Sequence, residues 1–309
     1  MALPFPNIHP EIFSIPAFHL GSLTIGPLAI RWYALAYVAG ILLGWYYAAR
    51  LVKTPRLWGG RPPTATPAQI DDLVLWVTLG VILGGRIGYI LFYMLPLPLE
   101  RDALAHNPWL ALEVWKGGMS FHGGMLGVLT AMALFARVNR IALFAIADIV
   151  VAAEPIGQFF GRVANFINGE LWGRITDVPW AISFCNQTIM DANGGVCPAT
   201  DAPRHPSQLY EAGLEGIVLF LILRWATHRA GWLQRHGAVS GLFLVGYGVF
   251  RILLETVRNP DEGLDNLPLG ITMGMILSVP MVLFGAWMIW RALKAPLPPA
   301  PAVEAHEPA

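Results

Sequence analysis

Long apolar stretches separated by short polar stretches run along most of the chain. Each apolar stretch is about twenty residues long, the length that an α-helix needs to cross the hydrocarbon core of a bilayer. This pattern predicts an all-α polytopic membrane protein with seven transmembrane helices. Their approximate ranges are 28–52, 70–95, 118–136, 141–160, 206–225, 239–257 and 269–290.

The segments outside the spans differ in character. Residues 1–25 are rich in proline and phenylalanine, and we expect them to lie on the membrane surface. A polar insert at about 174–205 separates the fourth span from the fifth, and the Pro/Ala-rich tail 295–309 is expected to be disordered. The sequence therefore predicts a surface segment, a membrane domain at 26–294 that carries the insert, and a tail.

Basic residues are concentrated in the loops after the first, third, fifth and seventh spans. The positive-inside rule places such loops in the cytoplasm. With seven spans, the N-terminus and the insert are then periplasmic, and the C-terminus is cytoplasmic. The basic residues concerned are Arg50, Lys53, Arg56, Arg61, Arg137, Arg140, Arg224, Arg229, Arg235, Arg291 and Lys294.

The composition agrees with a membrane protein. Of the 309 residues, 55% are hydrophobic and 13% are charged, about half of the roughly 25% found in soluble proteins. The formal net charge is zero, so no nucleic-acid partner is indicated. No Lys or Arg precedes Arg31, so the basic region of a cleavable signal peptide is missing. The two cysteines, Cys185 and Cys197, lie in the insert, where an oxidising compartment permits a disulfide.

Polar residues at the end of the fourth span are the first candidates for chemistry. The stretch 161–173, GRVANFINGELWG, brings Arg162, Asn165 and Glu170 close together along the chain. A charged side chain in the middle of a membrane helix costs about 2.5–3.5 kcal/mol on insertion scales, so such residues usually serve a function. A single arginine that snorkels to the headgroups is the structural alternative, but it would not need the amides and the carboxylate that follow.

The third span begins with the glycine-rich stretch 116–124, KGGMSFHGG, which contains His122 and Gly123. A helix N-terminus lined by glycine can bind a phosphate group through its backbone N–H groups. A histidine there can serve as a general base near neutral pH. The alternatives are close helix packing through the glycines and a histidine that is hydrogen-bonded to a neighbouring helix.

The sixth span carries Tyr247, Arg251, Glu255 and Arg258 at spacings of four, four and three, which places them on one helix face. Such a face must meet protein or water rather than lipid. An ion pair between Arg251 and Glu255 that only joins helices is the structural alternative. Arg258 also opens the stretch 258–261, RNPD, which is typical of a turn.

Arginines from several spans lie near the predicted outer surface. Arg86 lies toward the outer end of the second span, and the stretch 31–33, RWY, starts the first. Several arginines at one depth indicate an anionic ligand. No metal or other cofactor is expected, because the sequence has no paired histidine spacing and no dense carboxylate cluster.

Together these stretches resemble the bacterial prolipoprotein diacylglyceryl transferase family. The resemblance covers about residues 20–292. It implies an enzyme of the bacterial inner membrane that moves the diacylglyceryl group of phosphatidylglycerol to the lipobox cysteine of a prolipoprotein signal peptide and releases glycerol phosphate. It rests on GRVANFINGELWG at 161–173, RWY at 31–33, GRIGY at 85–89, GMSFHGG at 118–124, HPSQLYE at 205–211 and YGVFR at 247–251.

The resemblance also implies that Arg162 lies at the lipid-binding site. We expect Arg162 and Arg251 to bind the phosphate and to stabilise the charge of the leaving group. We expect His122 to remove the thiol proton, with Glu170 and Glu255 as alternative bases. The expected substrate-binding residues are Arg162, Tyr33, Arg86, Gly123, Asn165, Glu170, Gly173, Tyr247, Glu255 and Arg258.

Two other functions use the same residues. In a transporter or channel for an anionic metabolite, the arginines would line a path, although the sequence shows no convincing internal repeat of the kind that many transporters have. A phospholipid headgroup hydrolase or transferase would use water or a sugar as its acceptor.

Overall fold

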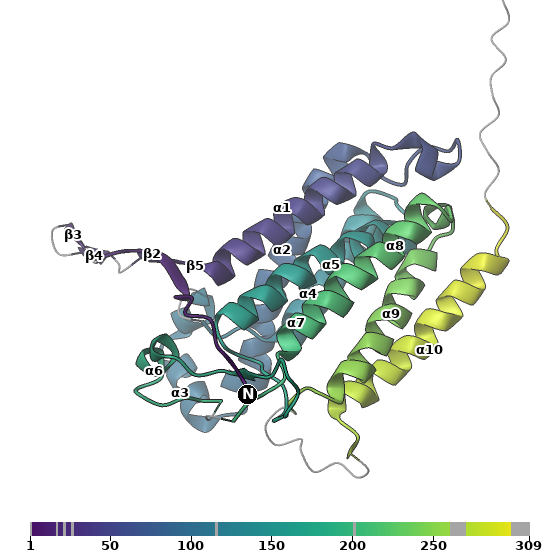
Figure 1. Cartoon of the computed structure of the whole chain (residues 1–309). Coiled ribbons are helices and arrows are strands. Elements are labelled where there is room, and N and C mark those ends of the chain that lie inside the picture. Colours follow the sequence, from purple (N-terminus) through teal and green to yellow (C-terminus); the bar gives the residue numbers. More distant parts are fainter. Residues whose placement is uncertain are drawn as a thin grey trace, which may run out of the picture. The chain divides into compact units, whose positions relative to one another are not determined.

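The computed structural model describes residues 2–16, 18–20, 23–25, 28–114, 117–199, 202–259 and 270–297. Most of these residues are helical, and six helices are long and apolar enough to cross a membrane (Figure 1). The prediction of an all-α polytopic membrane protein is confirmed. The six are α1 (Trp32–Val52), α2 with the π-helical turn that extends it (Pro67–Met94), α4 (Phe121–Val138), α5 (Leu143–Ile167), α9 (Ala238–Glu255) and α10 (Met273–Lys294).

The predicted fifth span is also helical, but it consists of three consecutive elements. These are α7 (Ser207–Glu211), a π-helical segment (Ala212–Val218) and α8 (Leu219–His228). Each of these elements is shorter than a membrane span, and the stretch as a whole contains two glutamates and an arginine.

The chain divides into two compact units. The first contains Met1–Tyr47 and Val150–Leu297, and the second contains Ala48–Ile149. Most of the predicted tail lies outside the described residues, as do Lys116 and the predicted turn residues Pro260 and Asp261.

The second unit is built on the packing of α2 against α4. Thr66 caps the N-terminus of α2 in a capping box with Gln69. Glycines allow the two helices to approach closely, since a Cβ atom on Gly80 would lie 2.6 Å from the carbonyl oxygen of Gly127. The polar segment after α2 forms the short helix α3 (Pro98–His106) and a 3-10 helix (Pro108–Leu112).

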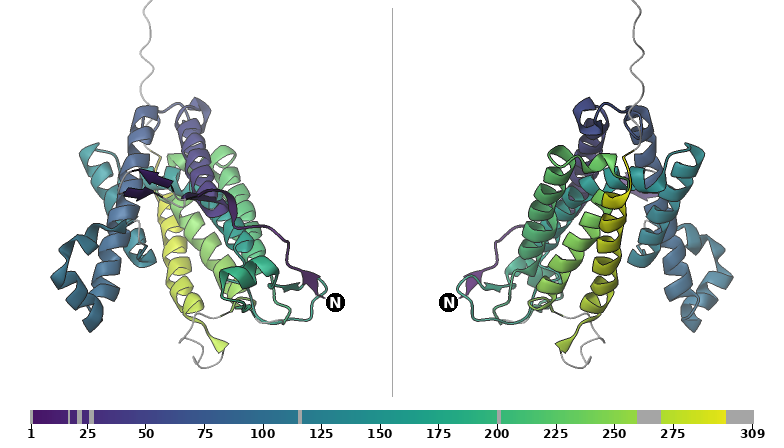
Figure 2. Two further views of the ribbon diagram at one scale, coloured as in Figure 1. Left: turned by 90° about the vertical axis from the view of Figure 1, so that its left-hand side faces the viewer. Right: turned by 90° about the vertical axis from the view of Figure 1, so that its right-hand side faces the viewer.

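In the first unit, α9 and α10 lie side by side, as both views of Figure 2 show. Small residues again set the contact, because a Cβ atom on Gly241 would lie 2.7 Å from the carbonyl oxygen of Gly285. The Thr272 side chain caps α10 by accepting a hydrogen bond from the Met275 N–H.

Short strands occupy parts of residues 1–31 and of the insert. The hydrophobic pattern did not predict them, because strands of two to five residues leave too few positions to show an alternation. The antiparallel pairs are β2 (Glu11–Ile15) with β5 (Leu28–Arg31) and β3 (Phe18–Leu20) with β4 (Leu23–Ile25); β1 (Leu3–Pro4) pairs in parallel with β6 (Ile182–Ser183).

Most helix boundaries differ from the predicted ones by a few residues; for example, α1 begins at Trp32, because residues 28–31 form strand β5. Two of the differences concern site residues. The fourth span was expected to end at Phe160, but α5 continues to Ile167, so Arg162 and Asn165 lie within the helix. Buried partners allow these polar residues to remain in a helix of the membrane. Conversely, α9 ends at Glu255, so Arg258 follows the helix instead of lying on it.

Candidate functional site

A fully buried carboxylate, that of Glu211 in α7, lies among three arginine side chains of the first unit. The Nε atom of Arg162 lies 2.8 Å from Oε2 of Glu211, and an Nη atom of Arg258 lies 2.5 Å from Oε1. An Nη atom of Arg251 lies 4.0 Å from Oε2. Arginines from two distant parts of the sequence, Arg162 and the pair Arg251 and Arg258, therefore converge on one acid.

A second carboxylate, that of Glu255, joins two of these arginines. Its Oε1 atom lies 2.7 Å from an Nη atom of Arg251 and 3.2 Å from Nε of Arg258. The ion pair between Arg251 and Glu255, which the sequence offered as the structural alternative, is present along α9, and it extends to Glu211 rather than forming an isolated pair.

A third carboxylate, that of Glu215, extends the cluster along the π-helical segment. It accepts a hydrogen bond of 2.7 Å from Nε2 of Gln158 and lies 3.9 Å from an Nη atom of Arg162. We call Arg162, Arg251, Arg258, Glu211, Glu215 and Glu255 the arginine–glutamate cluster.

Helix periodicity explains the assembly of the cluster. In α5, Glu154, Gln158 and Arg162 follow one another at intervals of four residues and therefore share a face. Glu211 and Glu215 have the same spacing, as do Tyr247 and Arg251 of α9. The hydroxyl of Tyr247 lies within electrostatic range of Arg162 and Arg251.

Two of the arginines are more exposed than the acids. The side chains of Arg162 and Arg251 are each 17% exposed, whereas those of Glu211 and Glu215 are completely buried and that of Glu255 is 5% exposed. Arg258 is 8% exposed. Arg162 and Arg251 are therefore partly accessible while they pair with buried acids.

The cluster includes residues outside the predicted site. Glu211 ends the stretch 205–211, and Glu215 and Gln158 lie outside the stretches that carry the family resemblance. Their signal in the sequence is their spacing, since polar residues four apart within an apolar run must face other polar groups.

A second group of predicted residues surrounds Glu170, just after α5. The side-chain amide of Asn165 donates a hydrogen bond of 2.8 Å to Oε1 of Glu170, and that of Asn168 lies 3.4 Å from the same oxygen. The hydroxyl of Tyr33 interacts with Asn165 and lies near Glu170. The start of α7 supports the same loop, because the Gln208 amide donates to the Glu170 carbonyl at 2.5 Å.

Position 173 requires a glycine because the segment around His205 approaches the backbone closely there. Its N–H donates to the carbonyl of His205 at 2.9 Å, and it forms an isolated β-bridge with Arg258. A Cβ atom at this position would lie 2.7 Å from Cβ of His205. Gly173 thereby joins the loop to the segments that carry Glu211 and Arg258.

Arg86 belongs to the second unit, where its guanidinium is surrounded by backbone carbonyls. Nε donates to Ala111 at 3.0 Å, one Nη donates to Gly117 at 2.9 Å and to Gly118 at 3.0 Å, and the other donates to Leu110. The side chain is buried. These bonds engage both Nη atoms and Nε, so Arg86 holds the segment that leads into α4.

His122 and Gly123 also belong to the second unit, in the first turn of α4. Gly123 is buried against α2, where an added Cβ atom would lie 2.8 Å from Cα of Gly88, so close packing accounts for it. Its N–H donates to the side chain of the N-cap residue Ser120 at 3.2 Å. His122 is exposed and contacts the ring of Phe121, with centroids 5.7 Å apart.

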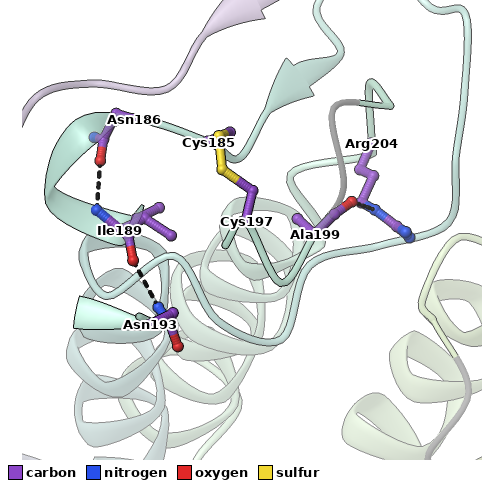
Figure 3. Close-up of a disulfide and its surroundings, with 7 residues drawn as sticks. All are labelled: Cys185, Asn186, Ile189, Asn193, Cys197, Ala199 and Arg204. Carbon is purple, nitrogen blue, oxygen red and sulfur yellow. Dashed lines mark hydrogen bonds between the residues drawn. A yellow bond between two sulfur atoms is a disulfide. The ribbon is translucent and has the colours of Figure 1, made fainter. Parts of the chain in front are cut away.

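The two cysteines of the insert, Cys185 and Cys197, form a disulfide with a Cα–Cα distance of 5.5 Å (Figure 3). The bond closes a loop that contains the short helix α6 (Gln187–Ala192). Among the described residues, no group of three or more His, Cys, Asp or Glu side chains is arranged to hold a metal ion.

Comparison with known proteins gives full-length matches. The sequence profile of the family described as prolipoprotein diacylglyceryl transferase matches residues 21–291. A phosphatidylglycerol–prolipoprotein diacylglyceryl transferase from Caulobacter sp. (strain K31) is 60% identical over 307 residues, which cover 99% of both chains. A protein of the same name from Caulobacter vibrioides (strain NA1000 / CB15N) is 58% identical over 99% of both chains. Another, from Phenylobacterium zucineum (strain HLK1), is 58% identical over 96% of this chain and 97% of the relative.

Proposed function

Because the chain belongs to the prolipoprotein diacylglyceryl transferase family, we propose that it transfers the diacylglyceryl group of phosphatidylglycerol to the lipobox cysteine of prolipoproteins. Glycerol phosphate is the second product. The observation that carries this proposal to specific residues is the convergence of Arg162, Arg251 and Arg258 on Glu211.

The phosphodiester of the lipid meets the exposed edges of Arg162 and Arg251. A guanidinium has five N–H donors in a planar fork, so it can serve a carboxylate on one edge and a phosphate on another. The lipid therefore does not need to displace Glu211 or Glu255. Arg258, which is more buried, holds these two acids in place.

In the reaction, the thiolate sulfur of the acceptor forms a bond to the glyceryl carbon that carries the phosphate ester oxygen. The bond between this carbon and the oxygen breaks, and the electron pair stays on the oxygen of the departing glycerol phosphate. The negative charge on the phosphate increases in this step. Arg162 and Arg251 stabilise that charge in surroundings of low dielectric constant, where preorganised donors are most effective.

The thiol must lose its proton before it attacks, because the thiolate is the nucleophile and a free cysteine has a pKa of about 8.5. We assign this step to His122, which is exposed at the start of α4. Glu170 and Glu255 are the alternatives. An unchanged pH–rate profile in His122→Gln would exclude the histidine.

The residues around Glu170 position the lipid headgroup. Asn165 interacts with both Tyr33 and Glu170, and Tyr247 lies on the same helix face as Arg251. Gly173 fixes the end of this loop by its close packing. In the second unit, Gly123 packs closely against α2, and Arg86 holds the segment before α4 by hydrogen bonds.

The membrane arrangement belongs to the same proposal. We count the helical stretch 207–228 as a seventh span, because its acids Glu211 and Glu215 face Arg162 rather than lipid. Basic loops then place the C-terminus in the cytoplasm and the insert in the periplasm of the inner membrane. The disulfide between Cys185 and Cys197 fits this side, because disulfides persist in oxidising compartments. Residues 1–25 lie on the periplasmic surface.

The test is the transfer of lipid to a lipobox peptide in liposomes that contain phosphatidylglycerol, followed by mass spectrometry of the peptide. Wild type should add a diacylglyceryl group without any nucleotide. Arg162→Ala and Arg251→Ala should lose at least about two orders of magnitude in rate, as expected for a removed charge-stabilising donor. Arg229→Ala, which removes an exposed arginine near the opposite end of the predicted fifth span, should retain the wild-type rate.

Retained activity in both cluster variants would remove the proposed phosphate site. An unmodified peptide together with flux of an anionic metabolite in wild-type liposomes would instead support the transporter. Turnover of phosphatidylglycerol in the absence of a thiol peptide would support the hydrolase.

A further inference from the structure

A small hydrophobic core joins the start of the chain to the insert of the first unit. Phe5 contributes to it from the N-terminal segment, and the insert contributes Ile182, Phe184, Ile189 and Ala199. Phe184 and Ala199 are completely buried, and Phe5 is 5% exposed. These residues form a packed body outside the membrane helices, which we call the insert core.

Hydrogen bonds join the same two segments. The Leu3 N–H donates to the carbonyl of Ala181 at 2.7 Å, next to the pairing of β1 with β6. The Asn186 side-chain amide donates to the carbonyl of Pro6 at 3.1 Å, and the Thr188 hydroxyl lies 3.2 Å from Oδ1 of Asn7. The N-terminal segment and the insert therefore form one body rather than two independent loops.

The insert core rests directly on the loop that carries Glu170. The ring of Phe166 at the end of α5 lies 5.5 Å from the ring of Phe5 and 6.0 Å from that of Phe184. Trp172, after Glu170, lies 6.4 Å from Phe184. Two aromatic residues that flank Glu170 in the sequence are thus anchored in this core.

The loop between these anchors has an uncommon backbone. Gly169 and Leu171, on either side of Glu170, have φ values of +65° and +57°. A side chain with a positive φ, as at Leu171, is uncommon and is maintained by its surroundings. Ile189 of α6 closes the space over Gly169, where an added Cβ atom would lie 2.6 Å from its Cδ1 atom.

The disulfide holds the segment that supplies Ile189. Cys185 follows Phe184 directly, and Cys197 precedes Ala199 by two residues, so the bond links both sides of the insert core (Figure 3). Asn186 and Asn193 close the two ends of α6 through hydrogen bonds of 2.8 Å to Ile189, one to its N–H and one to its carbonyl. Ile189 is therefore fixed in position from both directions.

We infer that the disulfide-bonded insert is a positioning element for the transferase site, and that Ile189 is the residue through which it holds Glu170 against Asn165. This inference rests on the proposed function. Ile189 acts through the loop and is a positioning residue rather than a catalytic one.

The experiment combines hydrogen exchange with kinetics on the full-length protein. The variants are Ile189→Ala, Cys185→Ser with Cys197→Ser, Gly169→Ala, and the combination of Gly169→Ala with Ile189→Ala. Val196→Ala is the matched control, because Val196 lies in the same insert but is 64% exposed. Ile189→Val keeps most of the side chain and should behave like wild type.

The Ile189→Ala variant and the double cysteine variant should lose hydrogen-exchange protection at the amides of residues 166–173, while α9 and α10 stay protected. The KM for phosphatidylglycerol should rise about tenfold with an unchanged KM for the peptide, since small displacements of positioning groups can cost up to about a hundredfold. The Gly169→Ala variant should also show a raised KM for phosphatidylglycerol. Adding Ile189→Ala should lower this KM part of the way back, because it removes the Cδ1 atom with which the new Cβ atom collides.

Three results would overturn the inference: wild-type exchange at 166–173 in the first two variants, equal changes in both KM values, or no coupling between positions 169 and 189. A wild-type protein that does not modify the peptide would instead overturn the proposed function. Hydrogen exchange would still decide the positioning role in that case.

Discussion

At the residue scale, the arginines of the site are matched by buried acids. Arg162, Arg251 and Arg258 face Glu211, Glu215 and Glu255, so the formal charges of these six residues cancel. Uncompensated charges in a medium of low dielectric constant are strongly unfavourable. The matching acids therefore keep the arginines in place before an anionic substrate arrives.

Glu211 should be the acid whose loss costs most, because it alone contacts all three arginines. Removal of one partner from a buried ion pair costs about 3–5 kcal/mol. We expect Glu211→Ala to lower the free energy of unfolding by about this amount and to abolish transfer.

The measurement is denaturant unfolding in detergent micelles. Glu215→Ala is the comparison, since its nearest arginine nitrogen is 3.9 Å away. Equal destabilisation by the two changes would contradict a central role for Glu211.

His205, in the insert, gives a prediction about pH. Burial lowers its pKa below the usual value of 6.5. The folded protein therefore binds this proton less readily than the unfolded chain, so the stability from neutral His205 is complete above about pH 6.5. It is lost as the pH falls toward the lowered pKa.

The unfolding midpoint of wild type should therefore decline between about pH 6.5 and pH 5, and the decline should be smaller in His205→Gln. Burial also lowers the pKa of His236, so part of the decline should remain in this variant and disappear when His236→Gln is added. A decline that is the same in the double variant and in wild type would exclude these histidines as its cause.

At the element scale, glycine pairs set how closely the helices approach. In α4, a Cβ atom at position 127 would lie 2.8 Å from the carbonyl carbon of Gly80, whereas one at position 124 would lie 3.8 Å from its nearest neighbour. Both glycines lie on the same helix, so they form an internal comparison.

Gly127→Ala should lower the free energy of unfolding by about 1–3 kcal/mol, the usual cost of overpacking. Gly124→Ala should be neutral or slightly stabilising, because alanine is the better helix former. Thermal unfolding of the two variants tests this pair, and equal melting temperatures would show that the α2–α4 contact can relax.

The helices themselves could be predicted from apolar length, but their ends could not. Arg162 and Asn165 appeared to follow the fourth span, because a sequence window shows polarity and does not show the acids that compensate it. The short pairing of β1 with β6 depends on residues nearly 180 positions apart, for which no local pattern exists. Tertiary partners thus decided the boundaries.

At the scale of the whole molecule, the number of spans fixes the sides on which the two termini lie. Six long apolar helices would place the termini on the same side, and seven spans place them on opposite sides. The stretch 207–228 consists of three short helical elements rather than one long helix, and its acids Glu211 and Glu215 face protein groups. We therefore expect the seven-span arrangement.

Reporter fusions distinguish the two arrangements. A phosphatase fused to the N-terminus should be active in the periplasm, and a fluorescent protein fused after Lys294 should fold in the cytoplasm. The same reporter active at both termini would contradict the seventh span. A fluorescent protein placed in the insert should remain dark, because the insert is expected outside.

The sequence predicted part of the site. Arg162, Asn165 and Glu170 were visible because one short stretch contains them all, and Arg251 and Glu255 because they share a helix face. The central role of Glu211 appears only when three helical regions are brought together. The role of Arg86 likewise could not be predicted, because its guanidinium donates to backbone carbonyls of the connecting segment between α2 and α4, which folds back onto it.

The π-helical segment Ala212–Val218 has a consequence for the register of the chain. A π-helical turn contains more residues than an α-helical turn, so this segment takes up about one residue more than regular α-helical winding would. Glu211 lies before this segment and α8 lies after it, and both α7 and α8 pack against α9. Deletion of one residue here would be absorbed by a return to α-helical winding, so this is the part of the span where the chain can lose a residue with the least rotation of α8 relative to α7.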